Sequence, residues 1–280
     1  MSPLVQRWKT AQRADGIAPT TLVERMRVMA RFTEWVGCNP EEATTDQIAE
    51  WMSEHLDAWS PATRSSYYGH LKAFYLWLVL MGHRDDDPMA RIKRPRVPRT
   101  QPRPVPDEHM PRLIGSISRK RTRAMVLLGA LAGLRVSEIA RVRGEDFDLL
   151  GGTLRVLGKG GVVADVAVHP LLADMALQMP RRGPWFPTHV GNHTNRDTIL
   201  GRSVSSIIGA AMRRASVPGT AHSLRHWFGT TLVDDGTDMR TVQELLRHAS
   251  LQTVQIYTKV RKTKKAAAVN RLDLYRVSAA

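Results

Sequence analysis

The chain of 280 residues is long enough for two domains, and 42% hydrophobic residues can supply a core, so wholesale disorder and a single small binding module are excluded. Its 41 Lys and Arg against 26 Asp and Glu give a net charge of +15, which favours a polyanionic partner such as nucleic acid. The apolar runs are too short to span a membrane, no secretory signal pattern is present, and the single cysteine has no partner, so we expect a protein of the reducing cytoplasm.

Residues 1–92 are predicted to form a small helical bundle. This part carries 10 basic and 12 acidic residues, so the positive excess lies further along the chain. In its third helix, apolar residues recur at steps of three and four, and we interpret its aromatic residues as core rather than as a platform for stacked bases. Three helices are expected, over residues 20 or 21 to 36, 45–56 and 60–81, opened by threonine or by a Ser-Pro pair.

A basic, proline-rich segment follows at residues 93–106. Five prolines in KRPRVPRTQPRPVP exclude helix and sheet alike. We predict an extended linker whose positive charges follow a polyanion, and an ordinary interdomain spacer is the equal alternative. Its basic residues are Lys93, Arg94, Arg96, Arg99 and Arg103.

Residues 107–280, with 26 basic and 14 acidic residues, are predicted to form a second domain, mostly helical with one small antiparallel sheet. Two β-branched runs joined by Gly158-Lys159-Gly160-Gly161 indicate the hairpin of that sheet. After a break at Gly133, Ser137 is a good N-cap for a short helix through Val142. One further helix is expected to start near residue 106 and another to span residues 121–132. From residue 203 onward the pattern is helical again, with helix breaks near residues 218 and 236, whereas residues 180–202 are expected to form loops.

No metal site is predicted. One cysteine cannot form a thiolate cage, and the sequence has neither a histidine pair with ligand-like spacing beside a carboxylate nor a Walker-type glycine loop. We therefore expect a mechanism without a metal ion or any other cofactor.

Five short motifs are informative through their order and spacing. They are AGLRVSE at residues 132–138, GKG at 158–160, HSLRH at 222–226, LRH at 246–248 and YTK at 257–259. Over about residues 107–260 this series resembles the tyrosine recombinases, also called phage integrases or lambda-type site-specific recombinases. Arg225 follows His222 by three residues and precedes His248 by 23, and Tyr257 lies nine residues beyond His248, as in the second conserved box of that family.

The chemistry of metal-free phosphoryl transfer independently calls for these residue types. Two guanidinium groups can hold the charge on the nonbridging oxygens of a phosphodiester, and Arg135 and Arg225 fit this role. Glu138 is the expected partner that orients Arg135. A hydroxyl nucleophile conserves the energy of the broken bond in a covalent intermediate, and Tyr257 is the candidate.

The resemblance implies roles for three further residues. Lys159 would donate a proton to the leaving 5′ oxygen, His222 would bind the scissile phosphate or assist proton transfer, and His248 would hold a nonbridging oxygen. His226 stays outside the predicted catalytic set. The chain departs from the family at Arg247, where glycine is usual. This puts close backbone packing before His248 in doubt, although a phosphate contact could be gained. A second departure is VVADV at residues 162–166, where many family members carry basic residues after the hairpin lysine.

The resemblance also implies an architecture and a reaction. An N-terminal SAM-like core-binding domain (1–92), the linker (93–106) and a catalytic domain (107–280) would clamp duplex recombination sites. Monomers or weak oligomers would assemble on DNA into a homotetramer, which would recombine strands through a 3′-phosphotyrosine intermediate and a Holliday junction. The C-terminal tail after Tyr257 would dock on a neighbouring protomer. A directionality factor is a possible accessory protein. Without room for an arm-binding domain, the chain would be a minimal member.

Phage or mobile-element integration and excision is the preferred biological role. The same brevity fits Xer-like resolution of chromosome dimers. A type IB topoisomerase and a catalytically silent DNA-binding regulator are the other classes that the sequence leaves open.

Overall fold

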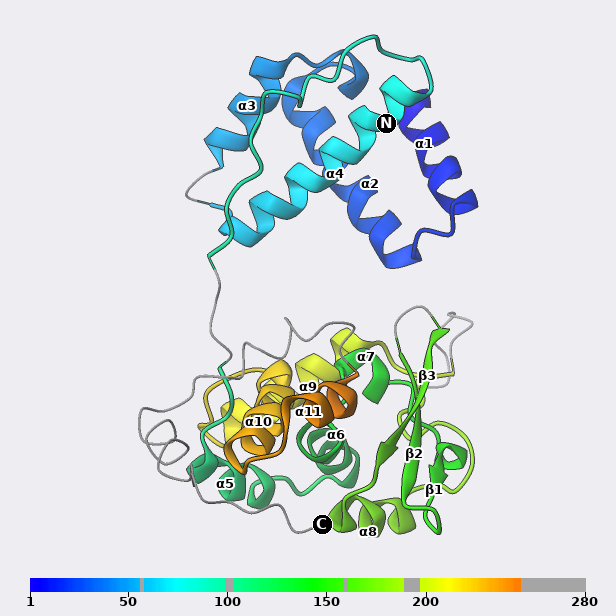
Figure 1. Cartoon of the computed structure of the whole chain (residues 1–280), viewed down its shortest axis with the longest axis vertical. Coiled ribbons are helices and arrows are strands. Elements are labelled where there is room, and N and C mark those ends of the chain that lie inside the picture. The colour runs from blue at the N-terminus through cyan, green and yellow to red at the C-terminus, as the bar shows by residue number, and fades with distance from the viewer. Residues whose placement is uncertain (56–57, 99–102, 159–160, 189–196, 248–280) are drawn as a thin grey trace, which may run out of the picture. The chain divides into compact units, whose positions relative to one another are not determined.

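The computed structural model describes residues 1–55, 58–98, 103–158, 161–188 and 197–247 (Figure 1). The chain divides into two compact units, residues 1–100 and 101–280, so the division falls inside the basic proline-rich segment. The predicted fold class, mainly helical with a small antiparallel sheet, is confirmed. No helix among the described residues is long and apolar enough to cross a membrane.

In the described residues of the first unit, four helices pack around aromatic side chains. Trp8 meets Phe74 with ring centroids 5.2 Å apart, and Phe32 meets the edge of Trp51 at 5.0 Å. Trp8, Phe32, Trp51 and Phe74 are at most 2% exposed, as expected for core residues. The helices are α1 (Pro3–Ala14), α2 (Pro19–Val36), α3 (Thr45–Glu54) and α4 (Pro61–Leu80), with a short 3₁₀ turn, η1 (Pro40–Glu42), before α3.

Two helix predictions in this unit need correction. Helix α1 is missing from the three predicted helices, although the Ser2 side chain accepts from the backbone N–H of Val5 in the same Ser-Pro arrangement that opens α4. The prediction that Thr20 or Thr21 caps α2 is wrong, because that helix begins at Pro19 with no side-chain cap. Proline suits the first helical position, since its fixed φ is already helical and it has no N–H to satisfy.

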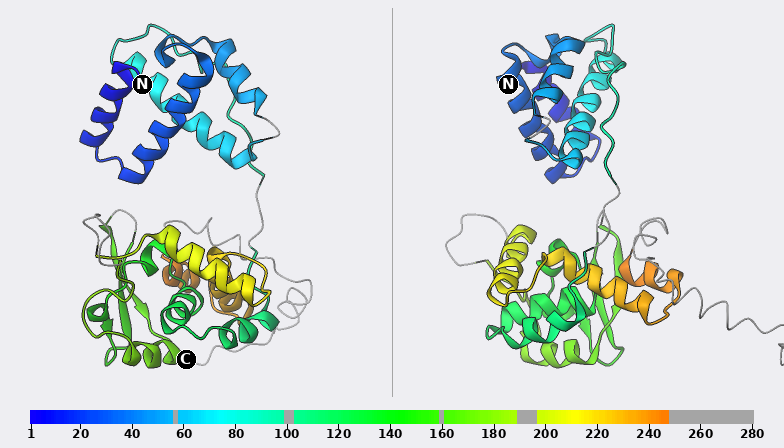
Figure 2. Two further views of the ribbon diagram at one scale, coloured as in Figure 1. Left: turned by 180° about the vertical axis from the view of Figure 1, so that it is seen from behind. Right: turned by 90° about the vertical axis from the view of Figure 1, so that its left-hand side faces the viewer.

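The second unit places helices beside a three-stranded antiparallel sheet (Figures 1 and 2). Leu154 pairs with Val166 and Val156 with Ala164, and the side chains of Leu154, Val156 and Val166 enter the core. The strands are β1 (Phe147–Asp148), β2 (Thr153–Leu157) and β3 (Val163–Ala167). The helices are α5 (Met110–Gly115), α6 (Lys120–Leu131), α7 (Val136–Ile139), α8 (Pro170–Gln178), α9 (Gly201–Arg214), α10 (Ala221–Asp234) and α11 (Met239–Leu246), with 3₁₀ turns η2 (Asp107–His109) and η3 (Gly144–Asp146).

Helix α6 is the centre of this unit, in contact with α7, α8, α9 and α10. Its residues 124–128 and 130 are at most 7% exposed, so it is buried on most sides, as the apolar run predicts. The chain leaves α6 through Gly133, whose φ of +59° turns the backbone directly into α7.

Three details of the second unit differ from the sequence predictions. Ser137 is not an N-cap: it lies inside α7, which starts at Val136 after Arg135 and ends at Ile139 rather than Val142. The Glu138 carboxylate accepts the backbone N–H of Arg135 and thereby supplies the cap from within the helix. Helix α8 and the two-residue strand β1 are also absent from the predicted elements.

Candidate active site

The first arginine of the site belongs to the turn between α6 and α7. Nη1 of Arg135 donates to Oε1 of Glu138 at 2.8 Å, and the backbone N–H of Arg135 donates to Oε2 at 2.8 Å. The Glu138 side chain is 2% exposed, whereas that of Arg135 is 37% exposed. The carboxylate therefore anchors one edge of a guanidinium whose remainder is accessible to a ligand.

Glu138 is ionised in this position. Burial by itself raises its pKa, but the hydrogen bond from the backbone of Arg135 and the charges of Arg247 and Arg135 outweigh burial, so the pKa lies below the ordinary glutamate value. An ionised carboxylate is the stronger acceptor for both guanidinium groups.

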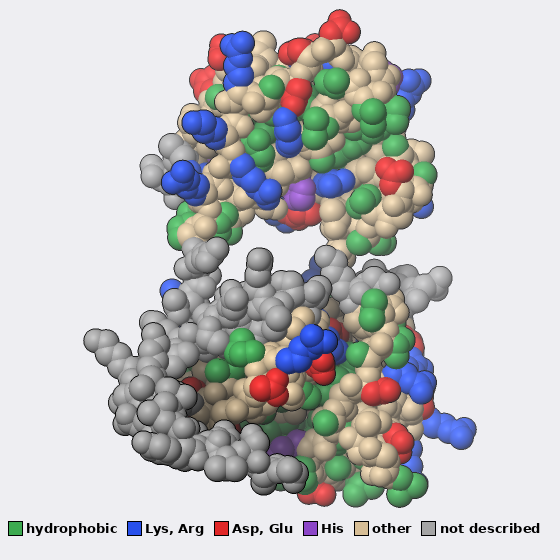
Figure 3. Space-filling view, viewed as in Figure 1, with side chains coloured by type: hydrophobic (Ala, Val, Ile, Leu, Met, Phe, Trp, Pro, Cys, Tyr) green, Lys and Arg blue, Asp and Glu red, His purple; other side chains and the backbone are tan. Residues whose placement is uncertain are grey.

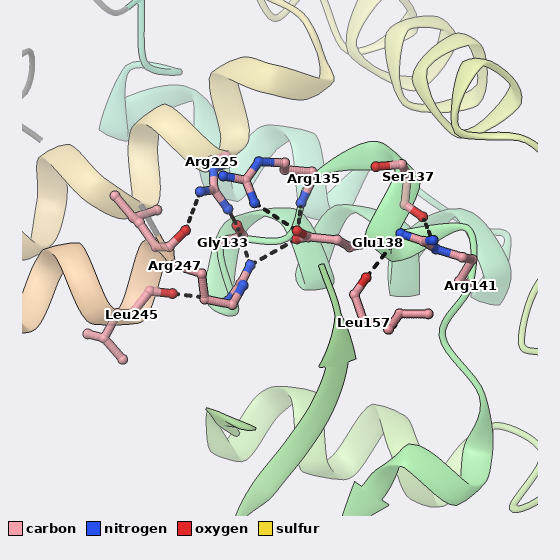
Figure 4. A network of polar contacts seen from close by, with 10 residues as sticks. Gly133, Arg135, Ser137, Glu138, Arg141, Leu157, Arg225, Leu245 and Arg247 are labelled. Carbon is pink, nitrogen blue, oxygen red and sulfur yellow. Dashed lines mark hydrogen bonds and ion pairs between the residues drawn. The ribbon is translucent and has the colours of Figure 1, made fainter. Parts of the chain in front are cut away.

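The second arginine comes from α10 and is almost completely enclosed. Arg225 is 1% exposed and donates from Nη1 to the carbonyl oxygen of Gly133 and from Nη2 to that of Leu246. These bonds tie the turn after α6 to the end of α11 (Figure 4). The two backbone carbonyls thereby fix the plane of the guanidinium.

A third arginine ends α11. Arg247 has φ +52°, the left-handed conformation in which glycine is usual, so the backbone turn expected of a glycine is retained despite the side chain. Its Nη2 donates to Oε2 of Glu138 at 2.9 Å and to the carbonyl oxygen of Gly133 at 3.3 Å. Glu138 consequently lies between two guanidinium groups (Figure 4).

Two histidines stand one turn apart on α10, with ring centroids 4.3 Å apart. Desolvation and the charges of Arg225 and Arg135 lower the pKa of His222 below its ordinary value. Desolvation, the neighbouring His222 and Arg225 lower the pKa of His226 to about 4. Both rings are therefore neutral at pH 7, and His222 lies within electrostatic reach of both predicted catalytic arginines.

A cavity of about 550 Å³ opens beside Arg135. Its lining includes Leu157 at the end of β2 and Gly158 and Gly161 at the tip of the hairpin. The hairpin between β2 and β3 therefore approaches Arg135, as expected if a residue at its tip donates a proton. Lys159 itself lies outside the described residues.

The structure brings Arg135, Glu138, Arg225 and His222 to one region, while His248 and Tyr257 lie outside the described residues. Of the linker residues, Lys93, Arg94, Arg96 and Arg103 lie in segments without helix or strand, and Arg99 lies outside the described residues. Arg94 donates from Nε to Oγ of Ser65 on α4 at 3.0 Å. In Figure 3, basic side chains lie scattered among hydrophobic and acidic ones on the displayed face of the first unit.

Two arginines at this site are not predicted from the sequence. Arg141 donates from Nε to the carbonyl oxygen of Ser137 and from Nη2 to that of Leu157, which joins α7 to the hairpin. Arg247 stands out in the sequence as a departure from the family pattern that could gain a phosphate contact, but its bond to Glu138 is not predicted. The bonds from Arg141 to Leu157 and from Arg247 to Glu138 have no local signal, because they join residues 16 and 109 positions apart. Among the described residues, no three His, Cys, Asp or Glu side chains cluster as metal ligands would.

Comparison with known proteins identifies the family of the chain. Residues 105–264 match the phage integrase family. The tyrosine recombinase XerA of Thermococcus kodakarensis is 32% identical over 265 residues, covering 92% of this chain and 90% of the relative.

Two solved structures extend the comparison. The integrase from mycobacterium phage Brujita is 45% identical, with a TM-score of 0.51 over 99% of this chain and 95% of the other. A lambda integrase tetramer bound to a Holliday junction is 18% identical, with a TM-score of 0.74 over 91% of this chain and 76% of the other, which demonstrates a shared fold.

Proposed function

The chain belongs to the phage integrase family and is thus a tyrosine recombinase, a DNA strand-transferring enzyme, and from this premise we propose that it integrates and excises phage or mobile-element DNA at specific sites. The observation that carries the phage role is the identity of 45% to the Brujita integrase over nearly the whole chain, against 32% to the XerA of Thermococcus kodakarensis. Xer-like resolution of chromosome dimers is the second candidate, because 90% of XerA is matched.

In the proposed reaction, the phosphodiester binds between Arg135 and Arg225. The Tyr257 oxygen attacks phosphorus, its proton passes to His222 or to solvent, and the bond from phosphorus to the 5′ oxygen breaks. Lys159 gives the leaving oxygen its proton, and His248 holds a nonbridging oxygen. A 5′ hydroxyl of the partner strand then attacks the 3′-phosphotyrosine, which reforms the phosphodiester and the phenol.

The neutral state of His222 supports its place in this scheme. A histidine that is uncharged at pH 7 can accept the phenolic proton, and the resulting imidazolium would lie beside the negative phosphorane. The adjacent arginines that lower the pKa of His222 in the free protein are neutralised in part when the phosphodiester binds. DNA binding itself would therefore make the histidine a better base.

We further propose that four copies assemble on two recombination sites, as the lambda integrase tetramer does on its Holliday junction. The basic linker residues Lys93, Arg94, Arg96, Arg99 and Arg103 would contact the DNA backbone, and the first unit would supply further phosphate contacts. The reaction would take place on DNA in the cytoplasm, with a directionality factor selecting excision.

Covalent trapping tests the proposed chemistry and selects the DNA site in the same experiment. The full chain is incubated with duplexes that carry two inverted, randomised half-sites. A nick beside the cleavage position lets the short fragment with the new 5′ hydroxyl escape after cleavage, so the covalent adduct accumulates. The DNA in adducts that resist denaturant is then sequenced. The wild type should accumulate adducts on a defined sequence. Tyr257→Phe should form none, whereas Tyr275→Phe, a matched change at the other tyrosine of this part of the chain, should react normally. Adducts with Tyr257→Phe would refute the assignment.

The selected sequence then separates the biological roles. Recombination between two different sites, one from the element and one from a host, supports integration, whereas efficient recombination between two identical copies supports Xer-like resolution. Relaxation of supercoiled plasmid that lacks the site would indicate a type IB topoisomerase. Tight binding with no adduct would indicate a DNA-binding regulator.

A further inference from the structure

Arg247 contacts the groups that hold both arginines of the site. Its Nη2 donates to Oε2 of Glu138, the carboxylate that anchors Arg135. The same nitrogen donates to the carbonyl oxygen of Gly133, which also accepts from Arg225. The carbonyl of Leu246, in the peptide bond to Arg247, accepts the other Arg225 nitrogen. One residue therefore joins the supports of Arg135 and Arg225.

Burial and backbone conformation distinguish Arg247 from a surface charge. The side chain is 11% exposed, and its Nε is buried without a hydrogen-bond partner among the described residues. Arg240, on the same helix, is 76% exposed and pairs with Glu244 at the surface. A largely enclosed arginine on a left-handed backbone costs stability that its ion pair with Glu138 must offset, so its presence points to a task in the site.

The direction of its donors indicates what that task is. Nη1 donates to the carbonyl oxygen of Leu245 at 3.0 Å, while Nη2 is shared by Glu138 and Gly133. Both terminal nitrogens are thus directed at protein acceptors, and Nη2 reaches the groups that support Arg135 and Arg225. These contacts suit a residue that acts through the supports of the two proposed phosphate-binding arginines.

We propose that Arg247 is a positioning residue that, through Glu138 and the Gly133 carbonyl, fixes the guanidinium groups of Arg135 and Arg225 relative to one another before DNA binds. Glu138 receives the backbone N–H and Nη1 of Arg135 and Nη2 of Arg247, so its carboxylate plane is held from both sides. Electrostatic stabilisation of a transition state is strongest when the donors need no rearrangement. The inference rests on the proposed recombinase function of the same site.

Arg247→Gly is a clean test, because glycine adopts φ +52° without strain while the guanidinium is lost. Single-turnover adduct formation is measured at saturating protein on the duplex selected above. We expect the cleavage rate constant to fall by about 10- to 100-fold, as misplacement of reacting groups typically causes. Affinity for uncleaved duplex, measured in the Tyr257→Phe background, should change by less than about threefold, since a positioning residue affects mainly the transition state. Arg240→Ala, which removes one arginine from the same helix, should cleave at the wild-type rate.

A double-mutant cycle with Glu138→Gln separates positioning from a general structural role. If Arg247 acts through Glu138, the change Arg247→Gly will slow cleavage far less in the Glu138→Gln background than in the wild type. Arg247→Lys, which keeps the charge, should recover part of the rate. Additive effects of the two substitutions, or wild-type cleavage by Arg247→Gly, would overturn the proposal. Absence of adducts with the wild type would instead refute the proposed function, so the two failures are distinguishable.

Discussion

Replacing Gly133 by alanine tests the turn that supports Arg225. A Cβ added there would lie 2.7 Å from Cδ1 of Phe228 on α10 and 3.3 Å from Cδ2 of Leu246 on α11, at a φ of +59°. Left-handed backbone costs an L residue about 1–2 kcal/mol, and displacing packed side chains costs about 1–3 kcal/mol. Alanine recovers about 0.4–1 kcal/mol through the lower entropy of the unfolded chain. The second unit should therefore lose roughly 2–3 kcal/mol of stability.

Gly236→Ala is the matched control for this substitution. Gly236 has φ +94°, and an added Cβ would have no atom within 4 Å, so only the backbone term applies. We expect a loss of about 1 kcal/mol. Because φ +59° is closer than +94° to the left-handed minimum, backbone strain by itself predicts that Gly133→Ala is the milder change. A larger effect at Gly133 can therefore be assigned to the contact with Phe228.

Amide hydrogen exchange of the full chain measures the difference. Opening free energies of α6 and α10 report the second unit, and α4 in the first unit is an internal reference that should not change. Gly133→Ala should also slow covalent trapping, since its carbonyl accepts from Arg225, whereas Gly236→Ala should not. Equal protection losses in the two variants would refute the packing argument.

Three further predictions concern charge. The pKa of Glu138 is lowered in the fold, so its ionised form stabilises the protein at pH values above the ordinary glutamate pKa of 4.5. The unfolding free energy lost in Glu138→Gln should therefore be largest near pH 7 and shrink as the pH falls below 4.5. A loss of unfolding free energy that does not depend on pH would contradict this. His226 should titrate near pH 4 by NMR. The free energy of unfolding should fall as the pH drops from 6.5 towards 4, because the unfolded chain then binds a proton that the folded chain does not. A titration midpoint of His226 near pH 6.5 would disprove the burial argument. Arg94→Ala should reduce the slope of log affinity against log salt by about 1 if Arg94 meets a phosphate, and an unchanged slope would exclude that contact.

Much of the fold follows from local signals in the sequence. Ser60 with Pro61 opens α4, and the hairpin glycines join β2 to β3, because each signal acts on the residues beside it. Ser2 with Pro3 carries the same information as Ser60 with Pro61, so α1 could have been predicted. The cap of α7 could not, because Arg135 is a poor capping residue and the capping acceptor is Glu138, inside the helix.

The candidate site divides along the same line. Motif order identified Arg135, Glu138 and Arg225, and the local spacing of three residues was enough to predict the pairing of Arg135 with Glu138. The bond between Arg247 and Glu138 spans 109 residues and depends on how α11 packs against the turn after α6. No periodicity or propensity records such a contact, so its recognition required the folded chain.

The charges at the site explain why an arginine is useful where a glycine would suffice for the backbone. Arg135, Arg225 and Arg247 against Glu138, with His222 neutral, leave a net of two positive charges. In the proposed reaction, when the phenolic proton passes to solvent, attack on a phosphodiester monoanion would give a transition state with two negative charges, which these residues would balance. Glycine at residue 247 would leave one positive charge, and Glu138 would then neutralise a larger share of Arg135. In the proposed site, the side chain of Arg247 would therefore complete the electrostatic balance, while its backbone keeps the turn that a glycine would make.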